Sequence, residues 1–168
     1  MRRVDREITQ MEDIIPMMEH MSVIRLGLVH EGMAYIVPVN YGYTRVPLTF
    51  YIHSACVGKK IELMRQNPRL SFEMDGAHRL IKADEACGYS FAYDSMMGQA
   101  TVSFIEDKEE KVYALNHLMT KHTSKKTWTY TDASLSRVCV LKLEVTQLSA
   151  KRHLHPDDSP IAIENGTD

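Results

Sequence analysis

The sequence predicts an α+β protein in which six or seven mostly antiparallel strands form a closed or nearly closed barrel, flanked by about three helices. Most strand segments alternate apolar and polar residues, which is typical of an antiparallel sheet with one face in water. The helical segments do not alternate with strands in the βαβ order of a parallel sheet. A length of 168 residues, 44% of them hydrophobic, fits one domain of this class.

The first elements are a helix and a β-hairpin. Apolar residues at spacings of three and four predict a helix from Asp5 to about Met18, with Asp5 as its cap and Pro16 near its end. Residues 21–29 and 33–39 have strand patterns separated by a short turn that contains glycine. We therefore expect these two segments to pair.

The middle of the chain alternates strands with a helix. Residues 40–43 are expected to be a loop, and residues 49–53 a short strand. A helix over 58–66 follows and is stopped by Asn67-Pro68. Residues 69–75 alternate in polarity and predict a half-buried strand.

Three more strands and a helix complete the expected fold. Alternation predicts two separate strands, over 89–93 and 100–104. Asp107 opens a capping box that leads into an amphipathic helix, and residues 138–148 form the final strand. These elements place the domain at residues 1–152, with an exposed polar tail at 153–168.

Charge and cysteine content restrict the class of protein. A net charge of −2 provides no overall attraction for nucleic acid or for an anionic membrane. The three cysteines (Cys56, Cys87 and Cys139) are widely spaced, which favours reduced thiols over a disulfide framework. The sequence has neither a secretory signal pattern nor an apolar run long enough to cross a bilayer. We therefore expect a cytoplasmic protein without nucleic-acid or membrane partners.

Residues 51–60 have the composition of an anion site. A strand end supplies His53 and Ser54, Gly58 permits close approach, and Lys59 and Lys60 open a helix whose N-terminal amides attract anions. The alternative is a solvated lysine pair beside a buried histidine. His53 and Cys56 also form an HxxC pair, but two ligands do not make a zinc site, so no metal is expected.

Arg25 is the second candidate. It stands in a strand that is otherwise apolar on both sides, so its guanidinium needs either exposure or an anionic or carbonyl partner.

Six segments, taken in order, resemble the pyridoxamine 5′-phosphate oxidase-like flavoproteins, and within that superfamily the nitroimidazole-resistance family. The segments are RRVDREI (2–8), IRLG (24–27), YIVPVNY (35–41), FYIHSA (50–55) with GKK (58–60), FE (72–73) and YDSMMG (93–98).

The resemblance implies an FMN-binding split β-barrel that works as a homodimer, with two flavins at the subunit interface. His53, Ser54, Lys59 and Lys60 would hold the FMN phosphate. Arg25 and Leu26 would lie at the polar edge of the flavin ring, which Val37, Pro38, Val39, Asn40 and Tyr41 would line, partly through backbone groups. The neighbouring subunit's side of the site would include Ser95, Met96, Met97 and Gly98.

The resemblance also implies a reaction. The protein would be an FMN-dependent oxidoreductase that reduces nitroimidazole-type or similar small aromatic substrates, with His53 as the catalytic candidate. The catalytic and phosphate-binding roles of His53 compete. Trp128 either covers a flat ligand or anchors the core. The alternative function is a flavin- or haem-binding protein of the same fold without turnover. True pyridoxamine phosphate oxidation is less favoured, because the C-terminus is acidic rather than arginine-rich.

Overall fold

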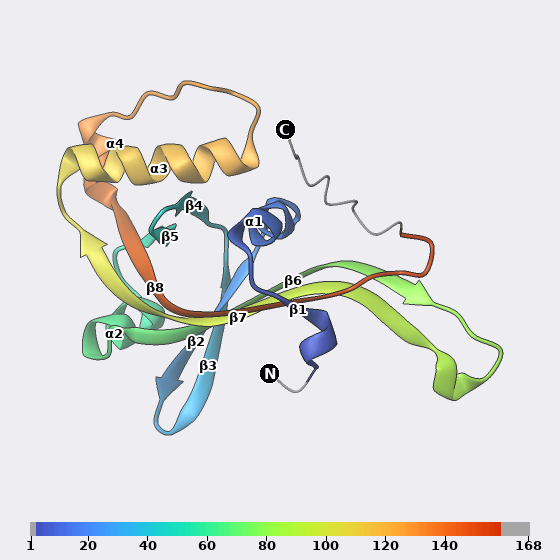
Figure 1. Ribbon diagram of the computed structural model, residues 1–168. Coiled ribbons are helices and arrows are strands. Elements are labelled where there is room, and N and C mark those ends of the chain that lie inside the picture. The colour runs from blue at the N-terminus through green and yellow to red at the C-terminus, as the bar shows by residue number, and fades with distance from the viewer. Residues whose placement is uncertain (1–2, 159–168) are drawn as a thin grey trace.

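An antiparallel sheet of eight strands forms the centre of the fold in the computed structural model, which describes residues 3–158 (Figure 1). The strands are β1 (Glu7–Ile8), β2 (Ile24–His30), β3 (Met33–Val39), β4 (Gly42–Arg45), β5 (Leu48–Ala55), β6 (Arg69–Ile81), β7 (Ser90–Ile105) and β8 (Val138–His153). The helices are α1 (Met11–His20), α2 (Lys59–Gln66), α3 (Lys108–His122) and α4 (Asp132–Arg137), with short 3-10 turns at Val4–Arg6 and Ala86–Gly88.

The sheet is curled but open. Its strand order is β3-β2-β6-β7-β8-β5-β4, and β1 pairs with β8 beside this path. Over residues 3–158, the end strands β3 and β4 do not pair with each other. The predicted α+β split barrel is confirmed, and of the two expected forms, closed or nearly closed, the sheet does not have the closed one.

The two strands predicted over 89–93 and 100–104 are parts of one continuous strand. β7 is a single strand of 16 residues that includes both 89–93 and 100–104, apart from Tyr89. The intervening segment also alternates, since Met96 is buried and Met97 is exposed, and it pairs with β6 and with β8. β8 is also longer than predicted and ends at His153, one residue beyond the predicted domain boundary. Most of the predicted tail, residues 159–168, lies outside the described part of the chain.

The N-terminal prediction is corrected in one respect. α1 begins at Met11, not at Asp5. Asp5 instead lies in a 3-10 turn, and its carboxylate accepts a hydrogen bond from the Arg3 side chain at 2.7 Å. Two other elements were not predicted. β4 begins inside the expected 40–43 loop, and α4 precedes β8.

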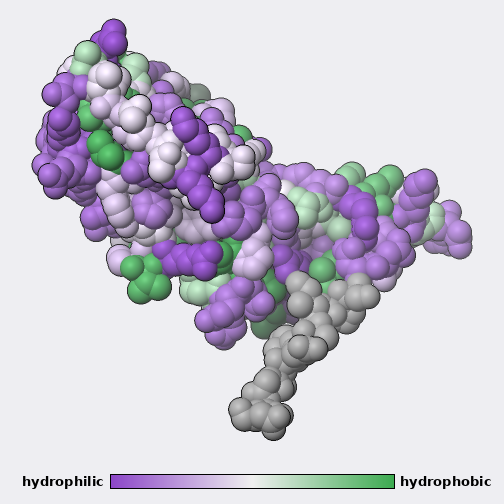
Figure 2. All heavy atoms as spheres, turned by 90° about the horizontal axis from the view of Figure 1, so that it is seen from above, coloured by the Kyte–Doolittle hydropathy of each residue, from purple (hydrophilic) through white to green (hydrophobic). Residues whose placement is uncertain are grey.

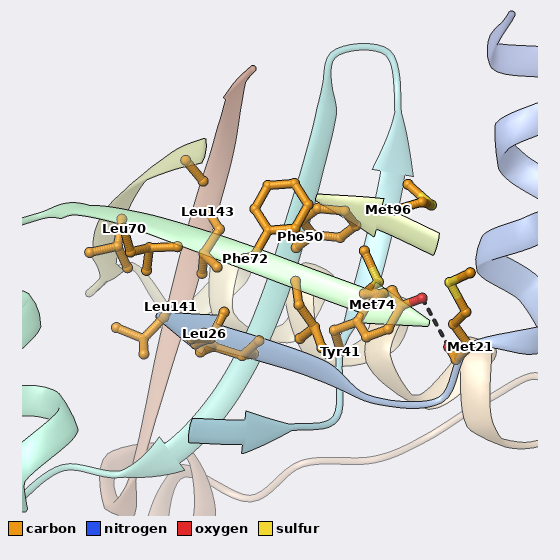
Figure 3. Close-up of a cluster of buried hydrophobic side chains, with 14 of the residues drawn as sticks. Met21, Leu26, Tyr41, Phe50, Leu70, Phe72, Met74, Met96, Leu141 and Leu143 are labelled. Atoms are coloured by element: carbon orange, nitrogen blue, oxygen red, sulfur yellow. Dashed lines mark hydrogen bonds between the residues drawn. The ribbon is translucent and has the colours of Figure 1, made fainter. Parts of the chain in front are cut away.

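The main core lies inside the curl of the sheet, where buried side chains from the five strands β2, β5, β6, β7 and β8 meet (Figure 3). The Phe50 ring packs edge-on against Tyr41 and Phe72, with ring centroids 5.4 and 5.2 Å apart. The Tyr41 hydroxyl lies 2.9 Å from the Met21 carbonyl and 3.0 Å from the Met18 carbonyl. These contacts satisfy the buried phenol and tie α1 to the barrel.

Helices cover part of the remaining apolar surface. α3 lies over β4 and β5, and encloses a second cluster of Tyr51, Ile105, Ala114 and Val140 (Figure 1). The outer ends of β6, β7 and β8 extend from the barrel as an arm. From above, the surface is largely hydrophilic with small apolar groups (Figure 2). None of the helices in residues 3–158 combines the length and apolarity that a bilayer span requires.

Candidate functional site

The end of β5 holds a buried hydroxyl group that has no partner. Ser54 is 8% exposed, and its Oγ makes no hydrogen bond to any described residue. A buried hydroxyl without a hydrogen bond costs about 1–3 kcal/mol. Such groups are rare in folded proteins, so this hydroxyl is a candidate for binding a group from outside the chain.

The N-terminus of α2 follows four residues later. Gly58 is the N-cap residue, with φ of +118°, and no side chain caps this end of the helix. A Cβ at Gly58 would meet no atom within 4 Å, so the approach to the helix end is open. Lys59 and Lys60 are the first two helical residues. Free amides, the helix dipole and two ammonium groups together favour a bound anion.

Lys59 also connects this helix end to β3. Its Nζ lies 5.0 Å from the centroid of the Tyr35 ring, which is an attractive cation–π distance. The cationic end of α2 is therefore held beside β3, the strand that carries the residues expected to line a flavin ring.

His53 is separated from this group by the strand itself. Successive side chains point to opposite faces of a strand, and here Ser54 is buried whereas His53 is exposed. The sequence predicted four residues around one anion. Ser54, Lys59 and Lys60 flank the β5–α2 connection along the chain, whereas His53 lies on the opposite face of β5 from Ser54. His53 faces solvent on the other side of β5.

The outer face of the sheet carries a second group of predicted residues. Pro38, Arg25, Glu73 and Met97 are successive register partners across β3, β2, β6 and β7. The row continues to Ser149 on β8. Arg25, Pro38 and Met97 were predicted at a flavin site, and the sheet brings them into one line.

Arg25 has both exposure to solvent and anionic partners, either of which would satisfy its guanidinium. Its side chain is partly exposed, and its Nη1 lies 2.9 Å from Glu73 Oε2 and also donates to the Asp75 carboxylate. These hydrogen bonds, to Asp75 and then to Glu73, raise the pKa of Arg25. His78 Nε2 lies 2.8 Å from the other Asp75 oxygen. The arginine thus belongs to a polar cluster of four residues, Arg25, Glu73, Asp75 and His78.

Sequence reasoning missed the acidic members of this cluster. The alternation of β6 was itself the signal, because Leu70, Phe72 and Met74 face inward and therefore place Glu73 and Asp75 outward.

The outer face is hollowed beside the Arg25 row. One hollow of about 360 Å³ is lined by residues that include Gly27, Ser71 and Gln99. A second of about 290 Å³ adjoins it at Ser71 and Gln99 and includes Gly98. A Cβ at Gly98 would lie 2.3 Å from the Gln147 carbonyl oxygen and 2.4 Å from the Phe72 ring, so β7 and β8 require glycine there.

Several predicted residues contribute no side chain to this face. Leu26, Tyr41 and Met96 are fully buried in the core, so any ligand contact they make uses their backbone. Asn40 donates its side-chain amide to the Ser22 carbonyl at 3.0 Å. The remaining predicted residues, Val37, Val39 and Ser95, are half-buried.

A larger hollow, of about 680 Å³, lies elsewhere. It separates α1 from Arg45 and Val46 and contains none of the predicted residues. A neighbouring hollow of about 350 Å³ shares Glu19 and Arg45 with it. Its Tyr43 donates to Glu19, and burial followed by this bond raises the pKa of Tyr43 to about 12.

Two further predictions concern metal and Trp128. Among residues 3–158, no three His, Cys, Asp or Glu side chains are grouped closely enough to hold a metal ion. Trp128 is half-buried in the segment that links α3 to α4, and it lies on neither the β5–α2 connection nor the Arg25 row.

Comparison with known proteins gives one family match. The family model for pyridoxamine 5′-phosphate oxidase matches residues 10–152. None of the curated proteins matches the chain.

Solved structures share the fold. A candidate 5-nitroimidazole antibiotic resistance protein from Bacteroides thetaiotaomicron is 32% identical, with a TM-score of 0.77, over 87% of this chain and 86% of that one. An FAD and haem binding protein from Mycobacterium smegmatis is 18% identical, with a TM-score of 0.79, over 92% and 77%. The flavocytochrome Anf3 from Azotobacter vinelandii is 14% identical, with a TM-score of 0.78, over 96% and 75%. At these identities, the last two show the fold alone.

Proposed function

The chain belongs to the pyridoxamine 5′-phosphate oxidase family, and from this premise we propose that it is an FMN-dependent oxidoreductase. Its flavins would lie at the interface of a homodimer, and its substrates would be nitroimidazole-type or similar small aromatic compounds. The observation that carries the proposal is the buried, unpartnered Ser54 hydroxyl at the base of a cationic helix N-terminus.

The β5–α2 connection would hold the phosphate of FMN. Ser54 would donate its hydroxyl to a phosphate oxygen, which removes the cost of its burial. The free amides at the start of α2 would bind the same group, and Lys59 and Lys60 would neutralise its charge. No other part of the described chain combines an orphaned buried donor with paired cations at a helix end.

The outer face of the sheet would receive the flavin ring and the second subunit. Val29, Ile36 and Met97 are exposed on this face, at 67%, 57% and 55%. Together with the hollows at Gly27 and Gly98, these apolar side chains would form the contact surface for a second copy. The likeness to the B. thetaiotaomicron protein supports the substrate class.

FMN would supply the transfer of electrons, and the chain would bind and orient the reactants. Arg25 would hydrogen-bond the polar edge of the ring, while Glu73 and Asp75 fix its guanidinium in place. The exposed His53 imidazole would exchange a proton with the substrate. This assignment favours the catalytic over the phosphate role for His53, because its side chain faces away from Ser54.

The alternative is a flavin or haem carrier without turnover, a function suggested by the two fold relatives that bind such groups. The absorption spectrum of the purified protein separates the cofactors, since flavin bands support FMN and a Soret band would overturn it. Heat release followed by chromatography and mass spectrometry distinguishes FMN from FAD.

A double substitution tests the phosphate site. Lys59→Ala with Lys60→Ala should strip the flavin from the purified protein. The matched control is Lys125→Ala with Lys126→Ala, an exposed lysine pair between α3 and α4. Stoichiometric FMN in the first variant would show that the phosphate binds elsewhere.

Catalysis has a separate test. Reduced protein mixed anaerobically with a 5-nitroimidazole should be reoxidised faster than free reduced FMN at the same concentration. Equal rates would reject the oxidoreductase proposal and leave the carrier.

A further inference from the structure

Two of the three cysteines lie side by side next to the proposed phosphate site, and the proposed reaction uses neither. Cys139 on β8 is the register partner of Ser54. Cys56 is one residue past Ala55, the last residue of β5 that pairs with β8 and the register partner of Val138. Its Sγ donates to the Arg137 carbonyl at 3.5 Å, so both thiols lie at the same end of the β5–β8 pair.

The register of β5 with β8 sets the spacing expected of these cysteines. With the pairing extended by one residue they would be diagonal neighbours, whose Cα atoms are about 7–8 Å apart. Disulfides span Cα distances up to about 6.8 Å. Cys56 lies just beyond Ala55, the last residue of β5 that pairs with β8, so the sheet does not hold its backbone in place. A movement of about 1 Å at Cys56 would allow the bond.

The two thiols differ in access to solvent. Cys56 is exposed, whereas Cys139 is 8% exposed. Burial, and then the neighbouring Cys56 thiol, raise the pKa of Cys139. An oxidant from solution therefore meets Cys56 first, and Cys139 is placed to react with the product.

We propose that Cys56 and Cys139 are a redox-active pair, which a hydroperoxide converts into a disulfide that weakens the phosphate site. The Cys56 sulfur, as its thiolate, attacks the hydroperoxide, so an S–O bond forms, the O–O bond breaks and an alcohol or water leaves. The Cys139 sulfur then attacks the sulfenic acid, the S–O bond breaks, and the hydroxide leaves as water with the Cys139 proton. In sum, two thiols are oxidised and one hydroperoxide is reduced.

The disulfide would act on the anion site through residues 56–58. This segment connects Ser54 to α2, and Gly58 holds its φ of +118° to begin the helix. Drawing Cys56 toward β8 would shift Gly58 and the amides of Lys59 and Lys60 away from the Ser54 hydroxyl. This second half of the proposal rests on the proposed function, whereas the formation of the disulfide does not.

Thiol counting and peptide mapping test the first half. The reduced protein has three free thiols, and hydrogen peroxide should leave one, that of Cys87. Trypsin should then release peptide 46–59 linked to peptide 138–142. Cys56→Ser and Cys139→Ser should each abolish the link. Cys87→Ser should retain it, because Cys87 lies at the tip of the β6–β7 hairpin.

Two results would overturn the disulfide. Peroxide could convert Cys56 to sulfinic or sulfonic acid while Cys139 stays free, or it could produce only links through Cys87. Cys56 is exposed, so Cys56→Ser keeps the test valid even where Cys139→Ser fails to fold.

FMN titration of the apo-protein tests the second half. The peroxide-treated protein should bind FMN at least 10-fold more weakly than the reduced protein, and dithiothreitol should restore binding. Unchanged affinity in a protein shown to be cross-linked would refute the coupling. A reduced protein that binds no FMN would instead refute the proposed function, while peptide mapping would still decide the disulfide.

Discussion

Replacement of Ser54 by alanine should change stability and flavin binding in opposite directions. The apo-protein buries the Ser54 hydroxyl without a hydrogen bond, at a cost of about 1–3 kcal/mol. Ser54→Ala removes that cost, so the free energy of unfolding of the apo-protein should rise by roughly 1–2 kcal/mol. For a protein of this size, each kcal/mol raises Tm by about 2–4 °C.

Binding should weaken because the same hydroxyl would bind the phosphate. A hydrogen bond to a charged group is worth about 1.5–3 kcal/mol, which corresponds to a Kd roughly 10- to 100-fold higher. Urea denaturation of the apo-protein measures the first effect, and FMN fluorescence titration measures the second. Ser103→Ala, at an exposed position on β7, is the matched control and should change neither. An apo-protein destabilised by Ser54→Ala, with an unchanged Kd for FMN, would refute the reasoning.

Three further outcomes are expected. Glu73→Gln removes a negative charge beside Arg25, so the midpoint potential of the bound flavin should rise by about 20 mV, equivalent to ~1 kcal/mol. A spectroscopic titration against a reference dye measures this potential, and an unchanged value would place the flavin ring away from Arg25. Gly98→Ala should lower the free energy of unfolding in urea by about 2–4 kcal/mol, because the new Cβ would clash with the Gln147 carbonyl on β8 and with the Phe72 ring. Gly27→Ala, whose Cβ would have its nearest contact at 3.5 Å, should lower it by under ~1 kcal/mol. Equal losses would contradict the close packing at β7. Burial holds the pKa of Tyr43 at about 12, above its unfolded value, so the contribution of this residue to stability should be complete below pH 10 and lost between pH 10 and 12. In urea unfolding at a series of pH values, Tyr43→Phe should reduce the loss of unfolding free energy over this interval by roughly 1 kcal/mol. An unchanged loss would show that other groups cause it.

The fold class could be predicted because apolar and polar residues alternate within short segments, which identifies strands of an antiparallel sheet. The hairpin of β2 and β3 and the strand β6 were placed by period alone. The unity of β7 was hidden because Ser95 and Gly98 interrupt its apolar pattern, although both lie within one ladder. The start of α1 was misplaced because Ile8 fits a helical stripe, and only its pairing with β8 places it in a strand.

The candidate site was predicted in composition but not in orientation. Spacing and resemblance brought together His53, Ser54 and the two lysines. The side-chain period of two on β5 separates the first two, and the sequence did not show which of them faces inward. The alternation of β6 could have placed Glu73 and Asp75 on the outer face, but not beside Arg25. They lie 48 and 50 residues away from it and meet it only through the register of β2 with β6.

The position of β8 also affects how the chain folds. β8 is the last strand in sequence, yet it lies between β5 and β7 and pairs with both, and β1 joins it as well. During synthesis, β5 and β7 therefore have no shared neighbour until residues 138–153 have emerged. Folding of the sheet should be slow, because the ladders that complete it join segments far apart in the chain. A chaperone that shields the apolar edges of β5 and β7 in the nascent chain would raise the yield of folded protein more than one that acts on the finished chain.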